Sequence, residues 1–315
     1  MDATPIILDV DPGHDDAVAI LLAAASPAID LLAVTCVAGN APLANTQENA
    51  RKVLTVAGVT DVPVAAGLDR PLVRPLVTAA HVHGQTGLDG PELPAPTVAL
   101  DPRHAVDLIV ETVTASARPL TLVPTGPLSN IAMALRRAPQ LKERVERIVL
   151  MGGAIAEGNM TPSAEFNIYV DPEAAHIVFT SGIPITMVGL DVTHQALVGP
   201  AEVAAIRALG TPVATMTAGL LDYYARFHQD LYGWDGVPLH DPCCVAALIR
   251  PGLITTKAMD VQIETTSALT LGRTVCDVWG VTGRAPNADV GVAIDRQGFI
   301  DVLMDCLGRY SVDSR

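Results

Sequence analysis

The sequence has few aromatic residues and few positive charges. Aromatic side chains make up 3% of the 315 residues, so the chain offers few rings on which single-stranded nucleic acid could stack. Lysine and arginine number 20 against 34 aspartates and glutamates, which gives a net charge of −14. This balance argues against nucleic acid or an anionic membrane surface as the main partner, although it does not exclude a small anionic ligand.

Cysteine is also scarce, and its spacing forms no metal-binding or disulfide pattern. The five cysteines include no C-x-x-C pair, which indicates reduced thiols in the cytosol. The N-terminus lacks the basic and apolar regions of a signal peptide. Apolar runs such as residues 17–25 are too short to span a bilayer. We therefore expect a cytoplasmic protein with no membrane partner.

Strand-like and helix-like segments alternate along most of the chain. Apolar runs favour strands at residues 6–10, 31–37, 120–123, 148–151 and 185–190. Helical patterns occupy residues 17–25, 44–57, 104–117, 128–136, 172–180 and 213–231. This alternation predicts an α/β fold with an open, mainly parallel, Rossmann-like sheet and helices on both faces.

The pattern changes after about residue 252. Residues 259–264 and 268–275 are predicted to form a β pair, followed by a strand at 290–294 and a closing helix. The chain shows no internal repeat, low-complexity tract or linker. We therefore predict one domain over residues 1–315 with an elaborated C-terminal part.

Four carboxylates fall within eight residues at the end of the first predicted strand. They are Asp9, Asp11, Asp15 and Asp16, and Pro12-Gly13 forms a turn among them. Carboxylates crowded in this way repel one another unless a cation lies between them, and such hard oxygen ligands favour Ca²⁺ or Mg²⁺. A simpler alternative is that Asp15 or Asp16 only caps the following helix while the others face water.

Polar residues also follow the later predicted strands. Ligands of open parallel sheets bind outside the carboxyl ends of the strands, so these residues are candidates for one site. No glycine-rich phosphate loop is present there. Carboxylates and carboxamides suit a polyhydroxylated neutral ligand, because each hydroxyl needs a donor or an acceptor. The candidates are Asn40, Thr125, Asn159, Glu165, Asn167, Asp191, His194, His240 and Asp241.

The segment Asp9-Val10-Asp11-Pro12-Gly13-His14-Asp15-Asp16-Ala17 resembles the N-terminal signature of the inosine-uridine-preferring nucleoside hydrolases. Further matches follow in order over nearly the whole chain. They are Val37-Ala38-Gly39-Asn40, a mobile-loop segment at residues 83–90, Pro124-Thr125-Gly126-Pro127, Met151-Gly152-Gly153, Glu165-Phe166-Asn167 and His240-Asp241-Pro242-Cys243.

The resemblance implies a reaction and an assembly. The reaction is Ca²⁺-dependent hydrolysis of the N-glycosidic bond of free ribonucleosides to ribose and base, in nucleoside salvage or catabolism. The expected substrates are uridine, cytidine and/or inosine. The expected assembly is a homodimer or homotetramer.

The resemblance also implies roles for single residues on the metal and sugar side. The residues that match the Ca²⁺ ligands are Asp11, Asp16, the backbone carbonyl of Thr125, and Asp241. Asp11 would also be the general base for the attacking water. The residues that match the ribose site are Asp15, Asn40, Asn159, Glu165 and Asn167, with Met151 and Phe166 on its apolar side.

On the base side, the resemblance implies that His240, His83 and Tyr232 act on the leaving group. His228 shapes this pocket, and it stands where pyrimidine-active relatives carry a glutamine. This departure leaves the choice between a pyrimidine and hypoxanthine open.

Two other functional classes are alternatives. The Asp9-Val10-Asp11 motif imitates that of a haloacid-dehalogenase-like phosphohydrolase, but the acidic residues that follow would repel phosphate. A catalytically silent nucleoside- or ribose-binding protein would be expected to lack Asp11 or Asp241, and both are present.

Overall fold

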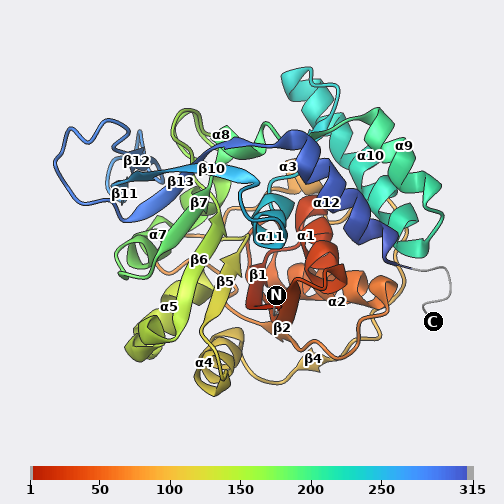
Figure 1. The fold of residues 1–315 in the computed structure, drawn as a ribbon, viewed down its shortest axis with the longest axis horizontal. Helices are drawn as coiled ribbons and strands as arrows, with labels where there is room; N and C mark the ends of the chain where they lie inside the picture. Colours follow the sequence, from red (N-terminus) through yellow and green to blue (C-terminus); the bar gives the residue numbers. More distant parts are fainter. Residues whose placement is uncertain (1–2, 311–315) are drawn as a thin grey trace.

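A nine-stranded sheet runs through the centre of the molecule, for which a computed structural model describes residues 3–310 (Figure 1). Its strand order is β10-β13-β7-β6-β5-β1-β2-β3-β4. All neighbouring strands are parallel except β10 and β13. The strands are β1 (Thr4–Val10), β2 (Ile29–Cys36), β3 (Val64–Ala66), β4 (Leu100–Asp101), β5 (Leu120–Pro124), β6 (Val145–Met151), β7 (Ile185–Val188), β10 (Ile254–Met259) and β13 (Ala288–Ile294). The predicted fold class is confirmed.

Helices cover both faces of this sheet and create two apolar cores. One core contains residues of α1 (His14–Ala25), α2 (Leu43–Ala57), α10 (Pro212–Tyr232), α11 (Pro242–Ile249) and α12 (Arg296–Gly308). The other contains residues of α4 (Ala105–Ala115), α5 (Ser129–Arg137) and α7 (Pro172–Phe179). Strand β1 feeds both, since Ile6 and Leu8 face the first core and Ile7 the second. A strand buried on both faces reads as a continuous apolar run, which made β1 recognisable in the sequence.

Short elements complete the fold. They are α3 (Ala80–His83), the 3₁₀ helix Pro139–Glu143, α6 (Phe166–Val170), α8 (Leu190–Thr193), α9 (Pro200–Ala208), and two small antiparallel pairs, β8 (Leu197–Val198) with β9 (Val237–Pro238) and β11 (Val261–Ile263) with β12 (Thr274–Cys276). No helix among residues 3–310 combines the length and the apolar character that crossing a membrane requires.

The C-terminal part differs from the prediction in two respects. The predicted β pair exists, but its second strand begins at Thr274, and residues 268–273 form a turn instead of a strand. The preceding segment forms β10, an unpredicted strand that pairs antiparallel with β13 in the central sheet. Strand β10 was missed because Thr255, Thr256 and Lys257 are polar and exposed, so it shows no apolar run.

Asn130 ties the carboxyl ends of two strands to the start of α5. Its side-chain Nδ2 donates to Asp9 Oδ1 at 2.8 Å and to the Cys36 carbonyl at 3.0 Å. Its Oδ1 accepts from the Leu68 backbone N–H at 2.9 Å. The side chain is fully buried, so water cannot replace any of these bonds.

We expect Asn130→Ala to lower the free energy of unfolding by about 2 kcal/mol, because the Leu68 N–H loses its acceptor and two buried acceptors each lose one of their two donors. Urea denaturation followed by circular dichroism measures this change. Gln297→Ala is the matched control, since its amide makes one exposed bond to Asp301, and it should cost less than about 0.5 kcal/mol. An equal effect of the two substitutions would contradict the structural role of Asn130.

Candidate functional site

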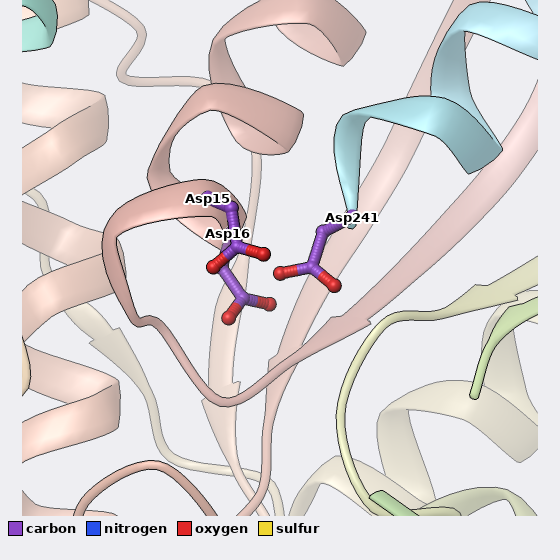
Figure 2. A group of neighbouring side chains, drawn as sticks. All are labelled: Asp15, Asp16 and Asp241. Atoms are coloured by element: carbon purple, nitrogen blue, oxygen red, sulfur yellow. The ribbon is translucent and has the colours of Figure 1, made fainter. Parts of the chain in front are cut away.

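Three aspartates converge at the carboxyl end of the sheet. Asp15 and Asp16 lie in the first turn of α1, which begins just after β1, and Asp241 immediately precedes α11. Their carboxylates point toward one another (Figure 2), and one oxygen of each lies within 4.8 Å of the other two. Asp241 is followed by Pro242, which occupies the first position of the helix, and a proline there is typical of a helix start.

The carboxylate of Asp16 accepts hydrogen bonds from three neighbouring segments. Its Oδ2 accepts from the Gly13 backbone N–H at 3.1 Å and from Asn40 Nδ2 at 3.3 Å. Its Oδ1 accepts from Thr125 Oγ1 at 2.8 Å. The turn after β1, the segment after β2 and the segment after β5 therefore meet at one carboxylate.

Asp11 lies beside this triad and is fully buried. Its Oδ2 accepts from the Asn40 backbone N–H at 2.7 Å, whereas no described residue bonds its Oδ1. Two glycines leave room for the carboxylate. A Cβ at Gly39 would lie 2.1 Å from Asp11 Oδ2, and one at Gly126 would lie 2.5 Å from Oδ1.

Burial raises the pKa of every carboxyl in this group. The pKa of Asp15 rises to about 7 through burial and through the charge of Asp16. The pKa values of Asp11 and Asp241 also lie well above their usual range, since each is buried and faces other aspartates. No lysine or arginine is among the described residues that line the adjoining pocket. Protonation, hydrogen-bond donors or a bound cation can each offset this charge.

The pocket above the aspartates gathers nearly all the residues assigned from the sequence. Every residue given a role from the sequence lines it except Asp11 and Asp16, which are buried. The further candidate Asp191 does not line it, and its carboxylate instead accepts from the backbone N–H groups of Ile155 and Ala156. The predicted residues that line it are Asp15, Asn40, His83, Thr125, Met151, Asn159, Glu165, Phe166, Asn167, His228, Tyr232, His240 and Asp241.

The start of α6 positions the pocket residues that are predicted to bind the sugar. Glu165 caps this helix, because its carboxylate accepts from the backbone N–H groups of Gly153, Asn167 and Ile168. Asn167 Nδ2 donates to the Thr125 carbonyl at 2.7 Å, which leaves that carbonyl one lone pair for another partner. The Glu165 carboxyl is buried, and this burial raises its pKa to about 7.

Among the described residues, five histidines line the pocket, and His83, His228 and His240 are the three with a predicted role. His240 Nδ1 lies 2.7 Å from Thr193 Oγ1, which leaves Nε2 available to a ligand. His228 Nδ1 donates to the Tyr224 carbonyl at 3.0 Å, because a carbonyl can only accept. Burial lowers the pKa of His228 to about 4, so Nε2 of the neutral ring carries a lone pair. Burial also holds the pKa values of His83 and His240 well below their usual range.

Sequence reasoning missed part of the pocket wall. The structure adds Tyr224 and Phe227 of α10, Met160, and His194, which had been a candidate without a role. The Tyr232 and Trp234 rings stack at 4.6 Å, and His194 lies edge-on to Trp234 at 5.0 Å. A sequence signal existed, because a chain with 3% aromatic residues concentrates several of them between residues 223 and 234.

Comparison with known proteins gives consistent results. The family described as inosine-uridine preferring nucleoside hydrolase matches residues 6–301. A pyrimidine-specific ribonucleoside hydrolase RihA from Shewanella sp. (strain ANA-3) is 54% identical over 308 residues, which cover 98% of this chain and 97% of the relative. RihA from Escherichia coli O17:K52:H18 (strain UMN026 / ExPEC) is 51% identical over 310 residues, covering 98% and 100%.

The fold of a solved structure matches nearly the whole of this chain. The purine-preferring ribonucleoside hydrolase from Gardnerella vaginalis superposes with a TM-score of 0.91 at 35% identity, covering 97% of this chain and 98% of that one. All the proteins named here are hydrolases of ribonucleosides, and none is a phosphohydrolase or a non-catalytic binding protein. The chain therefore belongs to the inosine-uridine preferring nucleoside hydrolases, enzymes that hydrolyse ribonucleosides to ribose and a free base.

Proposed function

We propose that this enzyme hydrolyses pyrimidine ribonucleosides and requires Ca²⁺. The observation that carries the proposal is the pocket itself, whose lining combines buried carboxylates with histidines and aromatic rings. A nucleoside has the matching polarity, since its ribose carries hydroxyls and its base is flat and largely apolar. The names of relatives at 51–54% identity support the pyrimidine.

Four groups would hold the metal. They are the carboxylates of Asp11, Asp16 and Asp241 and the backbone carbonyl of Thr125, and oxygen donors of this kind suit Ca²⁺. Asp11 fits this role because its Oδ1 is buried and has no partner among the described residues. The chemistry that Ca²⁺ supplies when bound is a lowered pKa for the attacking water.

The side chains of the site would divide the reaction between them. Asp11 accepts the proton of the water whose oxygen attacks the anomeric carbon. The N-glycosidic bond breaks with its electron pair going to the base, to which the neutral ring of His240 donates a hydrogen bond from Nε2. The base then takes its proton from solvent. Asp15, Asn40 and Glu165 hold the ribose hydroxyls, and the charge of the Asp15 and Glu165 carboxylates stabilises the oxocarbenium-like sugar.

The ring of His228 is compatible with a pyrimidine in the pocket. Its Nε2 can accept a hydrogen bond from a base N–H, because Nδ1 donates to Tyr224. The N3–H of uracil and the exocyclic amine of cytosine are donors of this kind. His228 can in this way replace the acceptor oxygen of the glutamine found in pyrimidine-active relatives.

We further propose a cytoplasmic homodimer or homotetramer. The five cysteines are free, which supports a reducing compartment. Leu269, Trp279 and Val281 are more than four-fifths exposed. They lie in the loops before and after β12, in the C-terminal part of the chain (Figure 1). Large exposed apolar side chains are typical of surfaces that bind another protein chain.

Removal of the metal tests the first part of the proposal. Elemental analysis of the purified protein should find about one Ca²⁺ per chain. Dialysis against a chelator should abolish uridine hydrolysis, because the carboxylates lose the charge that offsets their repulsion, and added Ca²⁺ should restore it. Full activity of the metal-free protein would contradict a calcium requirement.

Sugar selectivity tests the ribose side. We expect 2′-deoxyuridine to be hydrolysed with a kcat/KM at least about 100-fold below that of uridine, because buried polar groups would lose their partner. UMP should also be a poor substrate, since no lysine or arginine is among the described residues that line the pocket. Comparable release of uracil from all three compounds, measured by chromatography, would refute the assignment of Asp15, Asn40 and Glu165.

Leaving-group dependence tests the base side. His240→Ala should lower kcat/KM for uridine by about 100-fold or more, and that for p-nitrophenyl riboside far less, because p-nitrophenolate needs no hydrogen bond to leave. Tyr232→Phe should reduce uridine turnover more than inosine turnover. If His240→Ala slowed both substrates equally, this histidine would have a binding role instead.

A further inference from the structure

His14 is a buried residue to which the reaction above gives no task. It lies between Gly13 and Asp15, and it is fully shielded from solvent. Its ring Nε2 lies 2.8 Å from the carbonyl of Asp89. On the other side of the ring, Nδ1 lies 2.9 Å from Nδ1 of His83. The His14 backbone N–H points at the same His83 nitrogen from 3.2 Å.

Aromatic rings hold His14 in this orientation. Its imidazole is nearly parallel to Tyr223 and Tyr224, with centroids 5.1 and 5.5 Å away and interplanar angles of 3° in both cases. The ring of His83 stacks at 5.2 Å. Rotation of His14 would therefore break the ring contacts as well as both nitrogen contacts.

Gly13 keeps space for His83 at the same place. Its φ of −93° is open to any residue, so its backbone does not require glycine. A Cβ there would lie 2.7 Å from both Cε1 and Nδ1 of His83, and 2.9 Å from Asn40 Nδ2. The acidic turn is thus shaped to receive the imidazole of His83 as well as the carboxylates.

The segment after His83 is anchored to this turn by a second contact. Asn49 Nδ2 donates to the Pro12 carbonyl at 3.2 Å and to the Thr86 carbonyl at 2.8 Å. Within the segment, the Asp89 carboxylate accepts from the backbone N–H groups of Gln85 and Thr86. The Asp89 carbonyl that meets His14 is therefore itself held in a fixed position.

We propose that His14 is a positioning residue for His83. Because Nδ1 of His83 is engaged by His14, Nε2 is the ring nitrogen left to meet a nucleobase in the pocket. His14 then influences cleavage of the N-glycosidic bond through His83, without touching the substrate. This inference rests on the leaving-group role of His83 and adds to it the residue that sets the orientation of that ring.

The test compares two substrates in the full-length calcium-loaded enzyme. The readout is the ratio of kcat/KM for uridine to kcat/KM for p-nitrophenyl riboside. His83→Ala should lower this ratio about 100-fold. His14→Gln, which keeps a polar group near Nε2 but none near Nδ1, should lower it about tenfold. His14→Asn, whose amide reaches the place of Nδ1, should restore part of the ratio.

The double variant separates positioning from a general loss of structure. If His14 acts through His83, His14→Gln combined with His83→Ala should have a ratio within about threefold of that of His83→Ala alone. Damage to the acidic turn would slow both substrates alike and leave the ratio unchanged. An unchanged ratio in His14→Gln, with a lowered one in His83→Ala, would overturn the inference and leave the proposed function intact. An unchanged ratio in both would remove the leaving-group role of His83.

Asn45→Ala is the matched control for order in the segment. Asn45 Nδ2 donates to the Gln85 carbonyl at 3.1 Å, so it anchors the same segment without contacting His83. We expect this variant to leave the substrate ratio within about twofold of the unmodified enzyme. A tenfold loss of ratio in Asn45→Ala would attribute the effect to the segment as a whole and contradict a specific part for His14.

Discussion

Mutual repulsion between buried carboxylates is the constraint on which the rest of the site depends. Asp11, Asp15, Asp16 and Asp241 are all buried, and each of them has a raised pKa. Such a group cannot be stabilised by apolar packing, because burial disfavours every charged form. It can persist only where backbone N–H groups, hydroxyls, amides or a cation face the oxygens. Asn40 and Thr125 supply hydrogen-bond donors of this kind to the carboxylates of the site.

The fold meets this requirement by bringing the ends of parallel strands together. Because β1, β2 and β5 are adjacent and parallel, the segments that follow them converge at one edge of the sheet. Asp16 accepts bonds from all three of these segments, and Asn130 joins β1, β2 and the segment after β3 nearby. The position of the site is thus a property of strand order, while its chemistry comes from the few residues beyond each strand.

The polar residues at the carboxyl ends of the strands could be predicted from the sequence because they follow apolar strands within a few positions. Asp11, Asn40 and Thr125 are of this kind. The pocket wall formed by α10 was harder to predict, because the sequence alone does not distinguish Tyr224 and Phe227 from ordinary core residues. The contact of His14 with His83 joins residues 69 apart, and no local pattern encodes it. Strand β10 was missed because its exposed polar residues hide the periodicity of a strand.

The three glycines around the aspartates have a consequence for how such an enzyme can diverge. A side chain at Gly13, Gly39 or Gly126 would collide with groups of the site, so these three positions have almost no room for a larger residue. The end of α10 is different, because Tyr232 is 38% exposed and Gly233, in the left-handed region with a φ of 67°, ends the helix. Evolutionary change in base preference can therefore accumulate at one wall while the hydrolytic machinery is inherited unaltered. Relatives with purine-preferring and pyrimidine-specific names can share one fold for this reason.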